Sequence, residues 1–190
     1  MRIALTGGIA CGKSLVAKFL NEFGVETIDA DDVVHGLIPD PAERKRIAAE
    51  VFVDPEKRRR LEAELHPVVK SRIDAFLAAG GRSGLPRLAV IPLLFEVHWE
   101  GNFDIICCVV SSREKQIERM MTTRAMTRAE AEARLAAQLP VEEKAKKSHY
   151  VIRNDGTSEE LRSQTCAFVT WLEERVRSAR DTNGNGKANG

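Results

Sequence analysis

The feature that most constrains this chain is a glycine-rich segment close to its start, residues 7–14, with the sequence Gly-Gly-Ile-Ala-Cys-Gly-Lys-Ser. It fits the pattern G-x-x-x-x-G-K-[ST]. Residues 2–6 form a short, mostly apolar run that predicts a buried strand, and residues 15–23 carry apolar side chains at helical spacing. A strand, a glycine-rich loop and a helix in this order predict a phosphate-binding loop, because the loop amides and the positive end of the helix face the phosphates together.

The pattern predicts separate roles for the residues of this loop. We expect its backbone N–H groups to bind phosphate oxygens, Lys13 to reach the β- and γ-phosphates of ATP, and the Ser14 hydroxyl to be a ligand of Mg²⁺. The predicted ATP-binding residues of the loop are Gly8, Ile9, Ala10, Cys11, Gly12, Lys13, Ser14 and Leu15. By itself, the loop does not separate a kinase from a GTPase or a motor ATPase.

Length and composition exclude several classes of protein. A chain of 190 residues is long enough for one domain with a full core, and a formal net charge of +1 gives no electrostatic indication of a nucleic-acid partner. No stretch of apolar residues is long enough to predict a membrane span, and the first strand begins too early for a signal peptide. The four cysteines lack C-x-x-C spacing, so we expect neither a zinc site nor a disulfide framework. We therefore expect a cytoplasmic protein, since the cytoplasm keeps thiols reduced.

Strand and helix signals alternate along the chain. The predicted strands are residues 2–6, 25–28, 87–91, 104–110 and 150–152, and the predicted helices are 15–23, 42–51, 54–65, 68–79, 111–123, 128–138 and a long one after Thr157. Pro67 predicts a break between two helices, since proline lacks the N–H that a helix interior needs. Thr127 with Glu130, and Thr157 with Glu160, predict capping boxes. Residues 181–190 have nothing to bury and predict a disordered tail.

This alternation of strands and helices indicates the fold class. We predict an α/β protein with a P-loop: a doubly wound, five-stranded parallel sheet with helices on both faces.

Two carboxylates stand where the second predicted strand ends, at Asp29 and Asp31. In open α/β sheets ligands bind at the carboxyl ends of the strands, so both residues are expected near the phosphate loop. One could take the proton from an acceptor hydroxyl and the other could hold magnesium, which favours a kinase. The alternative is that such an Asp is only the N-cap of the next helix. No N/T-K-x-D guanine signature occurs in the chain, which argues against a GTPase.

Basic residues cluster in three segments. Residues 44–46 and 57–60 are most simply solvated helix faces, and binding of substrate phosphates is the alternative. The third cluster, in residues 113–128, lies on a helical hairpin where a small kinase has its lid. Its Arg119 and Arg124 would neutralise charge on the transferring phosphoryl group and help to exclude water.

Several sequence blocks together resemble the dephospho-CoA kinase family. They are residues 6–14 (TGGIACGKS), 28–31 (IDAD), 65–67 (LHP), 91–96 (IPLLFE) and 151–156 (VIRNDG), with Gln116, Arg119 and Gln138. The resemblance implies ATP-dependent phosphorylation of the ribose 3′-hydroxyl of dephospho-CoA, which gives coenzyme A and ADP. It also implies a core at residues 1–34, 85–112 and 148–180, a CoA-binding helical region at about 35–84, and a lid at about 113–147.

The same resemblance implies roles for individual residues. The implied catalytic residues are Asp31, as general base, with Lys13, Arg119 and Arg124. The residues expected to bind dephospho-CoA are Asp29, His35, His66, Pro92, Leu93, Leu94, Phe95 and Glu96. Asn154 and Gly156 are expected beside the adenine of ATP. The implied phosphoryl donor is ATP with Mg²⁺, the implied partner is dephospho-CoA, and a monomer or a small homo-oligomer is expected.

The chain departs from the family pattern at four places. Ala10-Cys11 replaces the usual Gly-Ser, His35 stands where Arg is usual, Arg124 lies one residue later than the usual lid arginine, and residues 38–51 form a shorter stretch. Because loop amides bind the phosphates, Ala10 is compatible if its backbone conformation accepts a Cβ. The alternative functions are another small-molecule kinase, of the nucleotide or shikimate type, and a nucleotide-binding regulator that has lost catalysis.

Overall fold

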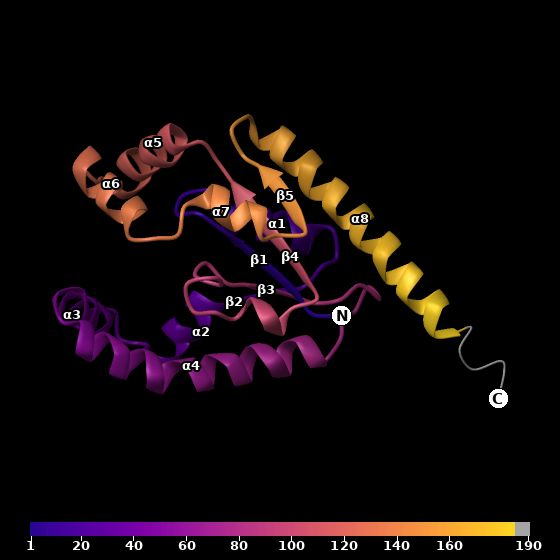
Figure 1. The fold of residues 1–190 in the computed structure, drawn as a ribbon, viewed down its shortest axis with the longest axis horizontal. Coiled ribbons are helices and arrows are strands. Elements are labelled where there is room, and N and C mark those ends of the chain that lie inside the picture. The colour runs from indigo at the N-terminus through magenta and orange to yellow at the C-terminus, as the bar shows by residue number, and fades with distance from the viewer. Residues whose placement is uncertain (185–190) are drawn as a thin grey trace.

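The computed structural model describes the backbone of residues 1–184 and their side chains, except those of residues 48, 52, 53, 55, 58 and 181–184 (Figure 1). A five-stranded sheet lies at the centre, with the strand order β2-β3-β1-β4-β5 and parallel pairing throughout. The strands are β1 (Ile3–Gly7), β2 (Thr27–Asp29), β3 (Leu88–Val90), β4 (Ile105–Val110) and β5 (Tyr150–Arg153). The predicted α/β fold with a five-stranded parallel sheet is confirmed.

Helices cover both faces of this sheet. The helices are α1 (Lys13–Glu22), α2 (Ala30–Leu37), α3 (Pro41–Val53), α4 (Pro55–Ala78), α5 (Arg113–Arg124), α6 (Arg128–Ala136), α7 (Val141–Lys146) and α8 (Ser158–Gly184), with one 3-10 turn, η1 (Glu100–Asn102). Within residues 1–184, no helix combines the length and the apolar character that crossing a bilayer requires.

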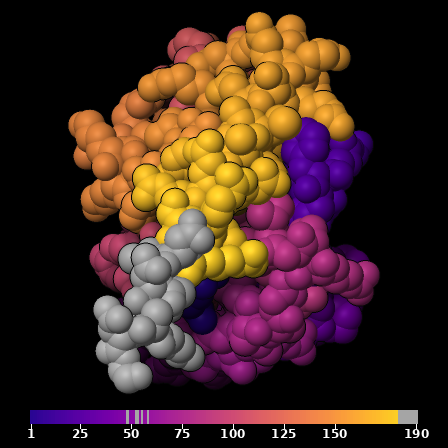
Figure 2. All heavy atoms as spheres, turned by 90° about the vertical axis from the view of Figure 1, so that its right-hand side faces the viewer, coloured from indigo at the N-terminus to yellow at the C-terminus, as the bar shows by residue number. Residues whose placement is uncertain are grey.

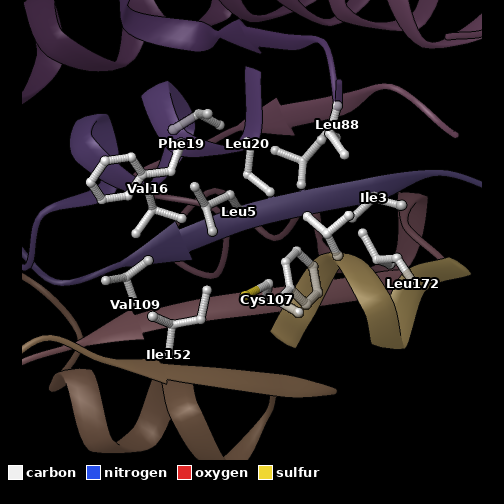
Figure 3. Packing of buried hydrophobic residues seen from close by; sticks show 14 of the residues in the cluster. Ile3, Leu5, Val16, Phe19, Leu20, Leu88, Cys107, Val109, Ile152 and Leu172 are labelled. Carbon is white, nitrogen blue, oxygen red and sulfur yellow. The ribbon is translucent and has the colours of Figure 1, made fainter. Parts of the chain in front are cut away.

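The central strand β1 shows why helices cover both faces of the sheet. Successive strand residues point to opposite faces, and every residue of β1 is buried. Ile3 and Leu5 pack with α1 and α8 in one apolar cluster, whose members meet between these elements in Figure 3. Ala4 packs on the other face with α2 and α4, through Val33 and Ile73 among others.

The C-terminal helix joins distant parts of the chain. The long helix predicted after Thr157 is confirmed as α8, and its Leu161, Phe168 and Leu172 are buried in the first cluster. Near its far end, α8 lies beside the loop that follows α4 (Figure 2), where the Arg180 guanidinium donates to the Gly84 carbonyl at 3.1 Å. The helix continues to Gly184, beyond the predicted start of the tail at residue 181. The rest of that predicted tail lies outside the described residues.

Two further elements differ from the sequence predictions. The predicted break at Pro67 is wrong, because α4 runs through it as one helix. Proline removes only one helical hydrogen bond, and burial of Val69 and Ile73 against the sheet favours continuation of the helix. The short helices α2 and α7 are not predicted by the apolar periodicity, since each has too few residues to show it.

The arrangement of the helices leaves the carboxyl ends of the strands accessible. The hairpin α5–α6 and the hairpin α3–α4 project on the same side of the molecule, beyond the end of the sheet at which β1 passes into α1 (Figure 1). Parallel strands all end at that edge, so residues that follow different strands come together there. The candidate site lies between these two hairpins.

Candidate functional site

The phosphate loop connects β1 to α1 in the predicted strand–loop–helix order. Gly12 is the N-cap of α1 and has φ 93°, in the left-handed region, and a Cβ there would collide with the side-chain amide of Asn154. Ala10 also has a left-handed backbone, with φ 58°. The loop therefore keeps its shape although Ala10 carries a Cβ, at a cost on the order of 1–2 kcal/mol.

Lys13 folds back over this loop. Its ammonium donates to the carbonyls of Gly7 and Gly8, at 3.2 and 2.8 Å. Burial lowers the pKa of Lys13 below the ordinary lysine value, and the nearby positive charge of Lys144 lowers it further. An anion that displaced these two carbonyls would bring negative charge to an incompletely compensated ammonium, as expected of a phosphate-binding lysine.

A cavity of about 430 Å³ opens beside the loop. Its walls bring together residues from five separate parts of the chain: Ile9, Ala10, Gly12, Lys13, Ser14, Asp29, Asp31, Pro92, Leu93, Arg119, Thr123, Arg124 and Gln138. We call it the nucleotide cavity. A larger hollow of about 770 Å³, near Met1 and Arg180, lies at the opposite end of the sheet, and the described residues that line it include neither the phosphate loop nor a carboxylate.

A second, apolar cavity of about 200 Å³ adjoins the first. It is lined by Ala30, Asp31, Val34, Leu61, Glu62, Leu65, His66, Val69, Ile91, Pro92, Leu93, Val97 and Trp99. We call it the acceptor cavity. His66 lines it and packs edge-on against Trp99, with ring centroids 5.3 Å apart. Asp31, Pro92 and Leu93 line both cavities and so form their common wall.

The two predicted carboxylates have different environments. Asp29 is the N-cap of α2, and its Oδ1 accepts from the backbone N–H of Asp31 at 2.8 Å. The alternative drawn from the sequence, an acidic N-cap, is therefore correct for Asp29, which also lines the nucleotide cavity. Burial raises the pKa of the Asp29 carboxyl. Asp31 stands on the first turn of α2 and is exposed.

The predicted substrate loop, residues 92–96, divides into two parts. Pro92 and Leu93 line the cavities, whereas Leu94 and Phe95 are buried in the cluster between the sheet and α4. Glu96 points to α7 and pairs with Lys144 at 2.7 Å. The prediction of direct substrate contact therefore does not describe the side chains of these last three residues. Apolar side chains at the end of a buried strand gain more from the core than from a wet cavity.

His35 also lies away from both cavities. It stands in the last turn of α2, more than half exposed, with its Nδ1 4.0 Å from an Asp32 carboxylate oxygen. In this structure the residue that replaces the usual arginine contacts its own helix, and neither cavity wall includes it.

Arg119 and Arg124 of α5, the two arginines predicted to act in a lid, differ in their partners. Arg119 donates to the carbonyl of Ala10, the Ser111 hydroxyl, and both the carbonyl and side-chain oxygens of Asn154, at 2.8–3.2 Å. It is thus held against the phosphate loop. Arg124 lines the nucleotide cavity, and none of the described residues forms an ion pair or hydrogen bond with its guanidinium. Of the two, Arg124 has the side chain available for a ligand.

The loop after β5 supports the phosphate loop from behind. The Asn154 side chain donates to the Cys11 carbonyl at 2.9 Å, and a Cβ on Gly156 would collide with Glu160, which closes the confirmed capping box with Thr157. Asn154 therefore contacts the phosphate loop directly, and Gly156 lies two residues further along the loop that follows β5. Cys11 is buried, and burial raises the pKa of its thiol.

The donor set of the nucleotide cavity fits magnesium. The Ser14 hydroxyl is exposed at the start of α1, and the carboxylates of Asp29 and Asp31 line the same cavity. Mg²⁺ in kinases binds through one or two protein oxygens together with substrate phosphates and water. Among the described residues, no group of three or more His, Cys, Asp or Glu side chains is placed to hold a metal ion.

Two polar residues near the site have roles that the sequence analysis did not predict. Gln138 follows α6, and its Oε1 accepts from the Ile9 N–H of the phosphate loop at 3.2 Å. Lys144 on α7 is completely buried beside Glu96. Gln138 belongs to a family block, but its partner is distant in sequence. Lys144 follows Val141 at helical spacing, a pattern that marks a buried face only once the surrounding fold is known.

Comparison with known proteins places the chain in a family. The sequence model of the dephospho-CoA kinase family matches residues 1–41 and 40–160. The dephospho-CoA kinase of Geobacter metallireducens is 40% identical over 200 residues, covering 94% of this chain and 98% of that protein. The crystal structure of TT1252 from Thermus thermophilus has 32% identity and a TM-score of 0.74, covering 90% of this chain and 97% of that one.

More distant structures share the fold alone. Shikimate kinase from Bacteroides thetaiotaomicron has 15% identity and a TM-score of 0.58, covering 91% of this chain and 98% of that chain. The likeness confirms the P-loop kinase architecture without bearing on the acceptor. The family match and the relative identical at 40% extend over most of the chain, including both cavities. The protein therefore belongs to the dephospho-CoA kinase family.

Proposed function

We propose that this enzyme transfers the γ-phosphoryl group of ATP to the ribose 3′-hydroxyl of dephospho-CoA, giving coenzyme A and ADP as the last step of coenzyme A biosynthesis. The main structural support for this proposal is the position of Asp31. It belongs to the wall that the nucleotide cavity and the acceptor cavity share. A phosphoryl acceptor must meet its base at the boundary between donor and acceptor. Family membership supports this choice of substrate.

On the donor side, the loop amides and Lys13 bind the ATP phosphates. The ammonium moves from the Gly7 and Gly8 carbonyls to the phosphates, where it stabilises charge that builds up in the transition state. The adenine lies towards Asn154 and Gly156. Ser14, with Asp29 or Asp31, would hold Mg²⁺, which would neutralise part of the negative charge of the phosphates.

On the acceptor side, Asp31 accepts a hydrogen bond from the ribose 3′-hydroxyl and takes its proton as the bond to phosphorus forms. Asp29 positions the helix turn that bears Asp31. His66, Pro92 and Leu93 form an apolar wall for the acceptor. The proposed CoA-binding region at about 35–84 contributes α4 to that wall, and the proposed core contributes the loop after β3.

The lid, proposed at residues 113–147, contributes its two arginines differently. Arg124 approaches the transferring phosphoryl group, because its guanidinium lines the cavity without a partner among the described residues. Arg119 holds Asn154 and Ala10 in register beside it. Exclusion of water by the lid limits transfer of the phosphoryl group to water.

The proposal also covers the assembly and the compartment. We propose a monomer or a small homo-oligomer in the cytoplasm. All four cysteines are free thiols, which is the state that a reducing compartment maintains.

A coupled assay of ADP release tests the function. Dephospho-CoA is expected to support turnover with ATP, whereas coenzyme A, in which the 3′-hydroxyl is already phosphorylated, should support none. Lys13→Ala is expected to abolish turnover without unfolding the protein, since among the described residues its ammonium donates only to backbone carbonyls. Turnover with shikimate or a nucleotide instead of dephospho-CoA would identify a different kinase. Binding of ATP and dephospho-CoA without ADP release would indicate a regulator.

A further inference from the structure

Lys144 on α7 is a lysine whose side chain lies inside the protein, although it is not part of the phosphate loop. Its side chain is completely buried, although it is charged and stands on the six-residue helix α7. Its ammonium contacts the Glu96 carboxylate at 2.7 Å and donates to the Pro92 carbonyl at 3.1 Å. Burial of a charge costs several kcal/mol even when it is paired. Both partners belong to one short loop, the one that forms the common wall of the two cavities.

The contacts continue from this loop to the phosphate loop. Glu96 Oε1 also accepts from the backbone N–H of Leu139, at 3.1 Å. The neighbouring residue, Gln138, accepts from the Ile9 N–H of the phosphate loop, at 3.2 Å. Two neighbouring residues between α6 and α7 therefore make hydrogen bonds in different directions. Leu139 is bonded to the loop after β3, and Gln138 is bonded to the phosphate loop. Its Gln138 lines the nucleotide cavity as well.

The Pro92 carbonyl lies where the two parts of the site converge. It accepts from Lys144 and also from the Thr6 hydroxyl at the end of β1, at 3.3 Å. Thr6 directly precedes the phosphate loop, and Pro92 lines both cavities. A small shift of the loop after β3, which contains Pro92, would move the acceptor wall relative to the phosphate loop. Phosphoryl transfer is sensitive to such displacements, since a misplacement of about 1 Å can cost about 10²-fold in rate.

We propose that Lys144 is a positioning residue for phosphoryl transfer, which fixes the Pro92 carbonyl and the Glu96 carboxylate and so sets the acceptor wall at a defined place relative to the phosphate loop. The proposal rests on the proposed function. The competing explanation is that Lys144 and Glu96 form a core ion pair that stabilises the fold and nothing else. Stability and substrate kinetics separate the two explanations, because a variant can restore one without the other.

The first variant is Lys144→Met, which fills similar space without charge. It should raise KM for dephospho-CoA about tenfold or more and lower kcat about 10- to 100-fold, while KM for ATP stays nearly unchanged. It also leaves Glu96 buried without its partner, so the melting temperature should fall by roughly 10 °C. The matched control is Lys146→Met on the same helix, where an exposed ammonium pairs with Glu143. This control should change neither KM nor kcat.

The deciding variant combines Lys144→Met with Glu96→Gln. The glutamine keeps an acceptor for the Leu139 N–H and removes the unpaired charge, so the melting temperature should return close to that of the wild type. The Pro92 carbonyl still lacks the ammonium, so KM for dephospho-CoA should stay raised. Recovery of KM together with stability, or an unchanged KM in Lys144→Met, would overturn the positioning role. A wild-type protein inactive on dephospho-CoA would instead contradict the proposed function and this inference with it.

Discussion

The carboxylate of Asp29 accepts a hydrogen bond from the backbone N–H of Asp31, at 2.8 Å, and thereby caps the helix on which Asp31 stands. The first residue of the pair is partly withdrawn from solvent, and the second is exposed in the common wall of two cavities. One carboxylate thus orients the backbone that carries the other. This division suits a pair in which Asp31 contacts the acceptor and Asp29 maintains the geometry.

The first prediction separates these two roles. Asp31→Asn should lower kcat by about 10²-fold, the lower end of the usual range for a general base, because phosphoryl transfer is largely dissociative and the carboxylate mainly orients the hydroxyl. Binding of dephospho-CoA, measured by calorimetry, should change little. Asp29→Asn should retain most of the helix cap, since Asn caps as well as Asp, and should lose less activity. Nearly full activity in Asp31→Asn with collapse in Asp29→Asn would reverse the assignment.

The second prediction concerns protons taken up with ATP. Burial lowers the pKa of Lys13 in the free enzyme below 10.5, and the negative phosphates of ATP should raise it again. Between the two pKa values the free enzyme is neutral at Lys13 and the complex is charged. ATP binding should therefore take up protons, and affinity should fall as pH rises through the lowered pKa.

Calorimetry in two buffers of different ionisation enthalpy, at a series of alkaline pH values up to the ordinary lysine pKa, measures this uptake. Lys13→Arg is the control, because a guanidinium stays protonated in that range and should show no such uptake at this position. Equal proton counts for the wild type and Lys13→Arg would contradict the lowered pKa of Lys13.

The third prediction distinguishes the arginines of α5. Arg124→Ala should lower kcat by about 10²-fold or more with a smaller loss in ATP affinity, since its guanidinium is free to meet charge that develops in the transition state. Arg119→Ala should instead lower the melting temperature and weaken ATP binding, because it removes the hydrogen bonds to Ala10 and Asn154. Steady-state kinetics and thermal unfolding on both variants measure the difference. A kcat effect confined to Arg119→Ala would exchange the two roles.

The fourth prediction concerns the tip of the α5–α6 hairpin. Ala125 ends α5 with φ 51°, a left-handed conformation in which a Cβ is unfavourable, and it is exposed. Ala125→Gly should stabilise the protein by about 0.5–1 kcal/mol in thermal or urea unfolding. Ala137 ends α6 in an ordinary right-handed conformation, also exposed, so Ala137→Gly should destabilise it by a similar amount. Equal effects of the two substitutions would rule out the backbone explanation.

Features that depend on contacts between residues near each other in the sequence could be predicted from the sequence. The phosphate loop depends on glycines next to a strand and a helix, and the capping boxes at Thr127 and Thr157 join residues three apart. The apolar stripe of α8 and the order of strands and helices are periodic patterns, which hydrophobic burial turns into a layered sheet. The carboxylates after β2 are brought to the phosphate loop because parallel strands end at one edge.

What the tertiary structure alone decided depends on partners that are distant in sequence. Whether Pro67 ends a helix was settled by burial of Val69 and Ile73 against the sheet, and the ion-pair partner of Glu96 is a lysine 48 positions later, Lys144. Arg119 and Arg124 look alike in the sequence, yet only Arg119 reaches Ala10, 109 residues away. The sequence by itself determined the architecture and the phosphate loop, because local hydrogen bonds and periodic burial act between near neighbours. The packing of the folded chain decides which polar side chains form hydrogen bonds within the protein and which remain available to ligands.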